Sequence, residues 1–331
     1  MPFIFAFCLA VLLTPVIARV GLILRLQDAP GELKIHPHPV PLTGGLAIVA
    51  SMSAAVVLLN DKPFGFAIGG ALIALALGTW DDARSLPVSV RLVAQVAIGL
   101  VVAAGLPPSL SVPLAQVAVV LLVIVTTNAV NLIDGQDGLA GGLTMIAALT
   151  LALAGGAGMD LAGLLIALAA AVGGFLVWNR PPARVFLGNG GAYAVGTLLA
   201  AGTVQTTVER GWRGFLAAGL CLGVFAFELL FTVARRLRDG SGLVAGDRGH
   251  SYDLLARTRG RAQVTIVFCL AGAVAGSLGA LVARIPLIAG AIATVLAAIA
   301  GLSAASWLWP RRSNPSIDLP EGRTMEVGDK T

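Results

Sequence analysis

The polar stretch most closely joined to an apolar segment runs from Asn128 to Gly138. Within it, Asn128, Asn131 and Asp134 recur at every third position, so on a helix they lie on one face. Glycines directly follow Asp134 and Asp137, which predicts that the helix ends there and that the backbone can approach a ligand closely. Polar side chains continuous with an apolar span are costly unless they face water. We interpret this stretch as a binding site. A turn capped by structural Asp and Asn side chains is the alternative.

Two adjacent carboxylates, Asp81 and Asp82, end another apolar stretch. Carboxylates this close repel each other unless a cation or a base lies between them, and a membrane boundary strengthens the effect. A Mg²⁺ ion would remove the repulsion, because this ion binds one or two carboxylates together with substrate phosphates. The alternative is a solvated helix end that only terminates the apolar stretch.

Two further clusters have weaker signatures. Residues 186–193 are rich in glycine, include Asn189 and precede an apolar run. Glycines before a helix can form a nest for phosphate, and close helix packing is the alternative. Asp247, Arg248 and His250 lie in an arginine-rich segment. Arginines bind phosphates in a bidentate manner and a histidine exchanges protons near neutral pH. Arginines that only fix the membrane topology are the alternative here.

Four more residues, Lys34, His36, His38 and Glu228, could contact phosphates or protons. Lys34 and His36 lie beside His38 in a loop that contains prolines, which indicates either phosphate contacts or a rigid interfacial loop. Glu228 lies inside an apolar span, where a carboxylate is a functional-site candidate, with an ion pair to a nearby arginine as the alternative. Carboxylates for a divalent cation, cations for phosphates and amides for a sugar or base are the components that phosphoryl transfer requires.

Composition indicates which elements position these residues. The 331-residue chain is 57% hydrophobic and 12% charged, with a mean hydropathy of +0.90, whereas a soluble domain is roughly 25% charged. Lipid must therefore be its main solvent. The pI of about 9.6 does not indicate a nucleic-acid partner, because the basic residues lie in short loops and form no extended face. We expect one membrane domain over residues 1–309 and a disordered polar tail over 310–331.

The fold class that follows is an all-α, polytopic transmembrane helix bundle of about ten or eleven spans. Each span is long enough, or nearly so, to cross a hydrocarbon core of about 30 Å. The predicted spans are 3–24, 43–60, 64–79, 90–105, 113–128, 139–156, 161–178, 190–207, 214–234, 263–283 and 286–308.

The distribution of basic residues predicts the orientation. If the N-terminus is outside, the external loops hold only Lys62, Arg210, Arg213 and Arg284, and the other 18 of the 22 basic residues lie on the cytoplasmic side. Every polar cluster described above then falls on that same side. We therefore predict a membrane protein whose active-site cleft faces the cytoplasm.

The order of the clusters resembles the polyprenyl-phosphate N-acetylhexosamine-1-phosphate transferase family, glycosyltransferase family 4, over about residues 34–261. Lys34-Ile35-His36 looks like the first loop of the family and Asp81-Asp82 like its paired aspartates. Asn128 to Gly138 matches the double Asp-Gly motif. Residues 186–191 resemble a later glycine-rich motif, and residues 247–250 resemble the start of the histidine motif.

The resemblance implies transfer of N-acetylhexosamine 1-phosphate, with N-acetylglucosamine 1-phosphate as the expected group, from a UDP-sugar to a polyprenyl phosphate. The products would be UMP and a lipid-linked sugar that initiates cell-envelope polysaccharide synthesis. The reaction would depend on Mg²⁺, with Mn²⁺ as a substitute, and a homodimer is left open. The resemblance implies catalytic roles for Asp81, Asp82, Asp134 and His250, metal binding by Asp82, Asp134 and Asn189, and substrate contacts by Lys34, His36, Asn128, Asn131, Asp137, Asn189 and Arg248.

The sequence departs from the family pattern at two places. Asn189 stands where the family usually has an aspartate that binds the metal. The usual cluster of histidines is reduced to His250, which argues against the muramoyl-pentapeptide branch. These departures motivate one alternative, a catalytically impaired relative that still binds polyprenyl phosphate. A secondary transporter with broken helices is the other, although the sequence has no internal repeat to support it.

Overall fold

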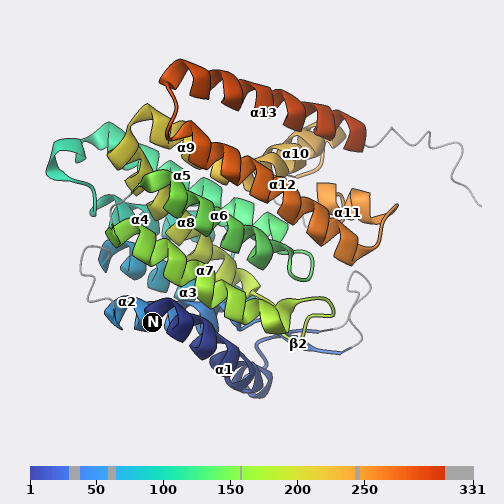
Figure 1. Cartoon of the computed structure of the whole chain (residues 1–331). Helices are drawn as coiled ribbons and strands as arrows, with labels where there is room; N and C mark the ends of the chain where they lie inside the picture. Colours follow the sequence, from blue (N-terminus) through green and yellow to red (C-terminus); the bar gives the residue numbers. More distant parts are fainter. Residues whose placement is uncertain (30–37, 59–64, 157–158, 243–246, 310–331) are drawn as a thin grey trace, which may run out of the picture.

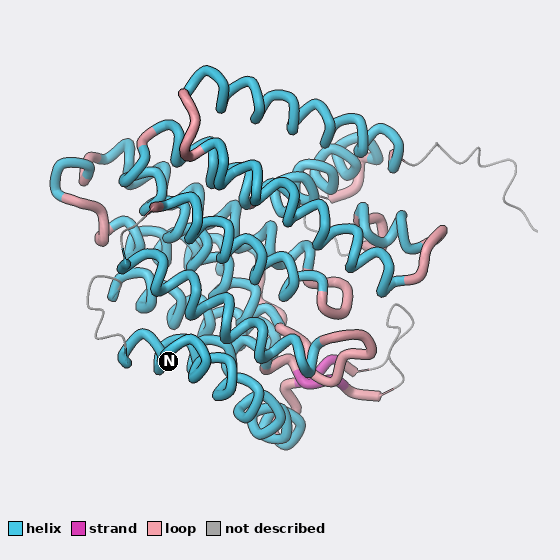
Figure 2. Tube along the Cα trace, viewed as in Figure 1, coloured by secondary structure: helices cyan, strands magenta, loops and turns pink. Residues whose placement is uncertain are grey.

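The computed structural model describes residues 1–29, 38–58, 65–156, 159–242 and 247–309. Lys34, His36 and the predicted tail 310–331 lie outside the described residues. Thirteen α-helices, one 3-10 helix and a two-stranded ribbon make up the described chain (Figures 1 and 2). In the ribbon, β1 (Gln27–Asp28) pairs antiparallel with β2 (Val40–Pro41). The predicted all-α bundle is therefore confirmed.

Each predicted span corresponds to a helix or, in one case, to two. The helices are α1 (Pro2–Ile23), α2 (Gly44–Leu58), α3 (Gly65–Arg84), α4 (Val88–Ala103), α5 (Pro113–Ile133), α6 (Leu139–Gly155), α7 (Met159–Asn179), α8 (Gly188–Arg210), α9 (Trp212–Cys221), α10 (Gly223–Asp239), α11 (Ser251–Ala256), α12 (Arg261–Val282) and α13 (Leu287–Leu308), with η1 (Pro108–Leu110) before α5.

Not every predicted span is a straight crossing helix. Six described helices, α1, α3, α5, α7, α12 and α13, are long and apolar enough to cross a membrane. The predicted span 214–234 is instead a pair, α9 and α10, bent by 69°. The helices α2, α4 and α6 are apolar but shorter, at 15–17 residues. The remaining helix, α8, is rich in glycine and buried along most of its length, so it does not need an apolar surface to face lipid.

The bundle is built around α8, which packs against α2, α3, α5, α6 and α9. The backbones come very close where α8 begins. A Cβ atom added at Gly45 would overlap the Cα atom of Gly191, and one added at Gly78 would overlap the carbonyl oxygen of Asn189. Glycines in α2 and α3 thus let both helices touch the first turn of α8, because small residues permit such close approach.

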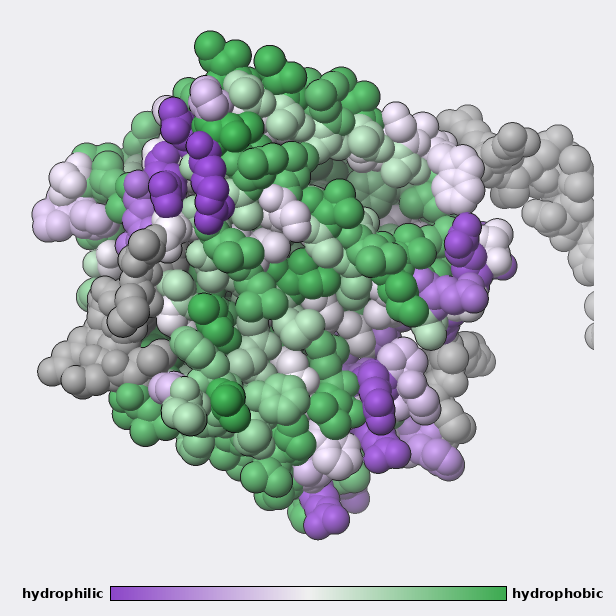
Figure 3. Space-filling model, viewed as in Figure 1, coloured by the Kyte–Doolittle hydropathy of each residue, from purple (hydrophilic) through white to green (hydrophobic). Residues whose placement is uncertain are grey.

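The outer surface is apolar. Large exposed side chains occur along α1, α4 and α13, and the single residue of α13 that is buried is Gly290. Figure 3 shows a broad hydrophobic face with hydrophilic residues gathered at its two ends. A surface of this kind requires lipid as its solvent. The chain is a polytopic membrane protein.

Two arginines close the C-terminal end of α6, at the end of the bundle opposite the polar clusters. Arg210 donates through Nε to the carbonyl of Gly155 at 3.0 Å, and Arg284 donates to the carbonyl of Leu153 at 2.7 Å. The last carbonyls of a helix have no partner within the helix, and cations near them are also favoured by the helix dipole. Two of the four basic residues predicted for the external loops therefore serve as caps.

Candidate active site

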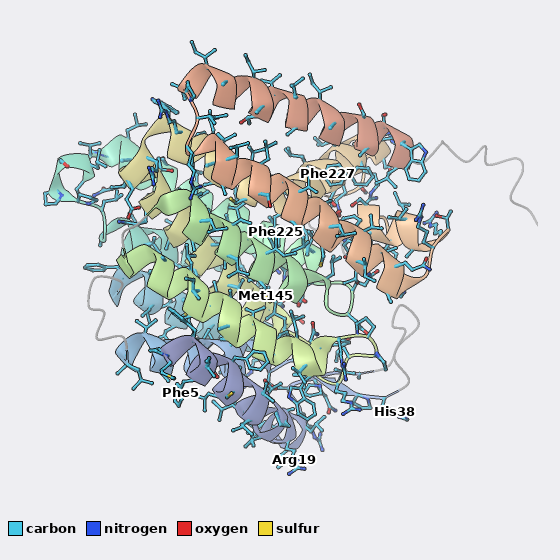
Figure 4. All side chains as sticks on the ribbon, viewed as in Figure 1. Phe5, Arg19, His38, Met145, Phe225 and Phe227 are labelled. Atoms are coloured by element: carbon cyan, nitrogen blue, oxygen red, sulfur yellow. The ribbon has the colours of Figure 1, made fainter. Side chains whose placement is uncertain are left out.

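Four segments that are distant in the sequence meet at one end of the bundle. They are the last turn of α3, the turn after α5, the first turn of α8, and α11 with the residues 247–250 that precede it. In Figure 1, β2 and α11 lie at this end, and Figure 4 places Arg19 and His38 towards it. As predicted, α5 continues through Asn131 and ends at Ile133, directly before the Asp134-Gly turn.

The first turn of α8 is bound by two carboxylates of the protein itself. Asp82 accepts hydrogen bonds from the backbone N–H groups of Asn189 at 3.1 Å and Gly190 at 3.3 Å. Asp134 lies beside the N–H of Gly188, which favours its charged form. The anion nest expected from the glycines is therefore real, but Asp82 and Asp134 fill it in the described structure. The charge of the helix N-terminus favours this arrangement.

Asp81 has a different environment from Asp82 and is only 5% exposed. Its Oδ2 accepts from the Asn189 side chain at 3.0 Å, from the Tyr193 hydroxyl at 3.2 Å and from Arg91 at 3.3 Å. Its Oδ1 accepts from the backbone N–H of Leu86 at 2.7 Å. Sequence reasoning did not find Arg91 or Tyr193. The available signal for Tyr193 was its place one helical turn after Asn189.

The two asparagines of the Asn-rich motif have separate partners. Asn131 donates from Nδ2 to the Oδ1 of Asn189 at 2.6 Å, which joins α5 to α8. Asn128 donates to Gln95 on α4 at 2.9 Å and to the carbonyl of Ile124. The structure thus brings Asn131 into the cluster with Asp81 and Asn189, and it pairs Asn128 with α4 instead.

Asp137 connects the turn after α5 to the loop that precedes α8. Its Oδ2 accepts from the backbone N–H of Ala183 at 2.9 Å. Its own carbonyl accepts from the hydroxyl of Thr265 at 3.1 Å. These contacts explain how the turn is held, and they leave one carboxylate oxygen of Asp137 without a described hydrogen bond to the protein. The predicted substrate contact of Asp137 stays a prediction.

A buried carboxylate positions the histidine. Glu228 on α10 has no exposed surface, and its Oε1 lies 2.9 Å from Nδ1 of His250. The same carboxylate accepts from the hydroxyls of Thr232 and Ser251. These partners replace the predicted alternative of an ion pair with a nearby arginine. Because Nδ1 faces Glu228, the other ring nitrogen of His250, Nε2, is the one left for a ligand.

Tyr252 connects His250 to the Asp134-Gly135 turn. The rings of His250 and Tyr252 stack with centroids 5.1 Å apart. The Tyr252 hydroxyl donates to the carbonyl of Leu132 at 3.0 Å, and a Cβ at Gly135 would overlap it. Tyr252 therefore attaches the segment around His250 to the carboxylate site.

A pair of arginines holds Asp247, which lies three residues before His250. Asp247 accepts from Arg235 at 2.6 Å and from Arg236 at 3.0 Å, and also from the backbone N–H of Gly249. Burial opposes the charge, but these donors outweigh it and lower the pKa of Asp247 to about 2. Arg248 lies nearby, 4.0 Å from Asp253, so the cluster predicted around Arg248 and His250 is present.

We expect Asp247→Asn to lower the thermal unfolding midpoint in detergent at pH 7 by about 2 °C, because two buried arginines lose one charged partner. A folded-state pKa below the usual ~3.9 means that the ionised carboxylate stabilises the protein above about pH 4. This contribution disappears as the pH falls through about 2. The difference between wild type and variant should therefore shrink from pH 7 to pH 3. Asp239→Asn, which removes a more exposed partner of Arg235, serves as the control. A difference that is constant with pH would contradict the assignment.

The atoms beside the first turn of α8 that could bind a metal are suited to Mg²⁺. The carboxylates of Asp82 and Asp134 and the side-chain oxygen of Asn189 all offer oxygen ligands, the type that this ion prefers. Burial, together with the neighbouring Asp82 carboxylate, raises the pKa of Asp134, and a cation would relieve that repulsion. Within the described parts of the chain, no three His, Cys, Asp or Glu side chains form a metal-binding group. Both oxygens of Glu228 are engaged by His250, Thr232 and Ser251, whereas Asp137 keeps one carboxylate oxygen without a described protein donor.

The contact between Gly78 and Asn189 allows a test of how the site is positioned. Gly78→Ala should separate α3 from the first turn of α8, because the new methyl group meets backbone that cannot move aside. A shift of about 1 Å at a catalytic group can cost about a hundredfold in rate, and we expect a loss of that size. Gly69→Ala on the same helix is the matched control, since its Cβ would meet only Val101, at 4.0 Å. Equal activity of the two variants would contradict this geometry.

The fold and the site define a membrane-embedded helix bundle with a carboxylate-rich polar site at one end. Comparison with known proteins identifies the family. The profile of glycosyl transferase family 4 matches residues 64–207. The chain belongs to this family, which confirms the resemblance drawn from the motifs.

Curated relatives cover most of the chain. It is 30% identical to the "Probable undecaprenyl-phosphate N-acetylglucosaminyl 1-phosphate transferase" of Bacillus subtilis, over 76% of this chain and 76% of the relative. It is 28% identical to the "Decaprenyl-phosphate N-acetylglucosaminephosphotransferase" of Mycolicibacterium smegmatis, over 74% and 73%. It is also 31% identical to the "Phospho-N-acetylmuramoyl-pentapeptide-transferase" of Chlorobium luteolum, over 65% and 72%. Sequence identity alone therefore does not separate the N-acetylglucosamine branch of the family from the muramoyl-pentapeptide branch.

Proposed function

We propose that this protein transfers N-acetylglucosamine 1-phosphate from UDP-N-acetylglucosamine to a membrane polyprenyl phosphate. The products would be the lipid diphosphate sugar and UMP, at the start of a cell-envelope polysaccharide. The observation that carries the proposal is the convergence of Asp82 and Asp134 on the first turn of α8. The names of two relatives support the sugar phosphate and the polyprenyl acceptor.

In the proposed reaction, an oxygen of the acceptor phosphate attacks the phosphorus that carries the sugar, and the bond from that phosphorus to UMP breaks. Asp82 orients the acceptor phosphate and accepts any proton it still carries. Arg248 and Nε2 of His250 bind the phosphates of the donor. Asp82, Asp134 and Asn189 would hold Mg²⁺ or Mn²⁺, which when bound neutralises phosphate charge. Lys34 and His36 remain predicted substrate contacts.

The bend between α9 and α10 suggests where the lipid chain of the acceptor lies. A cavity of about 180 Å³ is bounded there by α5, α8, α9 and α10, and its lining is apolar. Thr126, Ala129 and Val130 line it, and they occupy the turns of α5 directly before Asn131. A larger apolar groove beside Thr79 and Trp80 is more open to lipid. We place the part of the isoprenoid chain nearest the phosphate in this cavity, because its lining on α5 leads to the site.

The orientation in the membrane is part of the proposal. UDP-sugars are cytoplasmic metabolites, so the polar end of the bundle must face the cytoplasm of the cell. The excess of arginines in the segment from Arg235 to Arg261 agrees with this orientation. We therefore place the protein in the bacterial inner membrane with its active site on the cytoplasmic side.

The test is UMP release by the purified protein in detergent with polyprenyl phosphate. UDP-N-acetylglucosamine and related UDP-sugars are compared with and without Mg²⁺. Release of UMP that requires both the acceptor and Mg²⁺ is the expected result, and the preferred donor decides the branch. Absence of UMP with every donor, while the lipid phosphate still binds, would instead indicate a binding protein with a disabled metal site.

A further inference from the structure

The side chain of Asn189 uses both ends of its amide. Its Oδ1 accepts from Asn131 at 2.6 Å, and its Nδ2 donates to Oδ2 of Asp81 at 3.0 Å. A carboxylate at position 189 could keep the first contact but has no proton to donate in the second. It would also place two negatively charged oxygens about 3 Å apart, where like charges oppose ionisation. The amide at position 189 is therefore matched to Asp81.

The four hydrogen bonds to Asp81 leave it little capacity for a substrate. An ionised carboxylate has about four lone-pair sites, and four protein donors already occupy the oxygens of Asp81. Three of the donors are side chains, from Arg91 on α4 and from Asn189 and Tyr193 on α8. Asp82 differs, because its only described donors are the two backbone N–H groups of Asn189 and Gly190. The two aspartates thus have unequal access to a ligand.

Asn189 also connects the two carboxylates, since its side chain binds Asp81 while its backbone N–H binds Asp82. We infer that Asp81 and Asn189 form a positioning pair that fixes the first turn of α8 against α3, and that Asp82 alone of the paired aspartates touches the reacting groups. The inference rests on the proposed function for the reaction, while the pair itself rests on the hydrogen bonds. On this inference the amide of Asn189 serves to bind Asp81. Its presence in place of the family aspartate is then more than the loss of a metal ligand.

An exchange of the two side chains tests the pair. Asp81→Asn and Asn189→Asp are made singly and together, and the thermal unfolding midpoint is measured in detergent without nucleotide or divalent cation. Each single variant should unfold at a lower temperature than wild type. The double variant again has one amide and one carboxylate, so it should recover at least half of the summed loss. Gln116→Glu, far from the site, controls for an amide replaced by a carboxylate.

The rates of the same variants show whether Asp81 positions other groups or takes part in the reaction itself. UMP release by the double variant should exceed that of Asp81→Asn at least tenfold. A double variant that recovers its midpoint but stays as inactive as Asp81→Asn would show that Asp81 itself reacts, and would overturn the assignment to Asp82. Additive midpoint losses would overturn the pair. If the wild type releases no UMP, the proposed function fails, while the midpoints still decide whether Asp81 and Asn189 are paired.

Tyr193→Phe provides a milder variant that keeps the core packed. The tyrosine is 1% exposed, and the change removes only the hydroxyl that donates to Asp81. One hydrogen bond of this kind corresponds to about 0.5–1.5 kcal/mol, or roughly a 2- to 10-fold change in rate. We expect turnover to fall by that factor while the KM for the donor is unchanged. An unchanged turnover would contradict a positioning role for Asp81.

Discussion

Asp82→Asn lowers the rate of UMP release by about a thousandfold or more, the largest effect expected from a single change in this protein. The carboxylate is lost at the place where the acceptor phosphate and the cation are proposed to lie. A thousandfold loss corresponds to about 4 kcal/mol of transition-state stabilisation. The two backbone donors bind different oxygens of Asp82, so one of them can still bond to the single amide oxygen and the change in volume is small. The fold should therefore persist. Initial rates at saturating donor and acceptor measure the effect.

The matched control for Asp82→Asn is Glu209→Gln, the same kind of change near the other end of α8. Glu209 has an exposed hydrogen bond with Gln205 and lies far from the site. Its rate should stay within about twofold of wild type, since exposed contacts of this kind contribute little. An Asp82→Asn protein that keeps more than a tenth of the wild-type rate would refute the role of Asp82.

Glu228→Ala should lower UMP release by about a hundredfold. Removal of the carboxylate leaves Thr232, Ser251 and His250 without their shared acceptor in a buried place, and each such loss costs about 1–3 kcal/mol. The His250 ring then loses the contact that fixes its orientation. We also expect a lower thermal unfolding midpoint, because His250 and Ser251, at the start of α11, are attached to α10 through the same carboxylate.

Two comparisons make the Glu228 result informative. Glu209→Ala tests removal of a carboxylate that has no contact with the site, and it should leave both rate and midpoint near wild type. His250→Ala should resemble Glu228→Ala in rate, since both remove a correctly placed imidazole. If Glu228→Ala lost stability but kept its rate, the position of His250 would not matter for the reaction.

The sequence was sufficient for the parts of the fold that depend on local pattern. Hydropathy predicted every apolar span of the bundle, but not the short helix α11, and the glycine after Asp134 predicted where α5 ends. The bend between α9 and α10 was missed, because apolar residues continue without interruption through Leu222. Hydropathy records how apolar a segment is, and it does not record the direction that packing imposes on it.

The partners of the site residues depend on contacts between distant segments. Tyr193 donates to a carboxylate 112 residues away, and in the sequence it looks like any aromatic residue in an apolar span. Asn128 fits the same periodic pattern as Asn131, yet it pairs with Gln95 on a neighbouring helix. The types of residue in the site were therefore predictable, while their division into positioning and reacting groups required the arrangement of the helices.

The caps on α6 have a consequence for how the chain is made. The carbonyls of Gly155 and Leu153 are capped by arginines that lie 55 and 131 residues further along the chain. During synthesis, α6 therefore enters the membrane before either cap exists, and its C-terminal end must meet water or lipid headgroups until Arg210 emerges at the end of α8. A nascent chain that stops before Arg284 still lacks the cap on Leu153. Residues that follow α12 therefore complete the end of a helix that begins at the site.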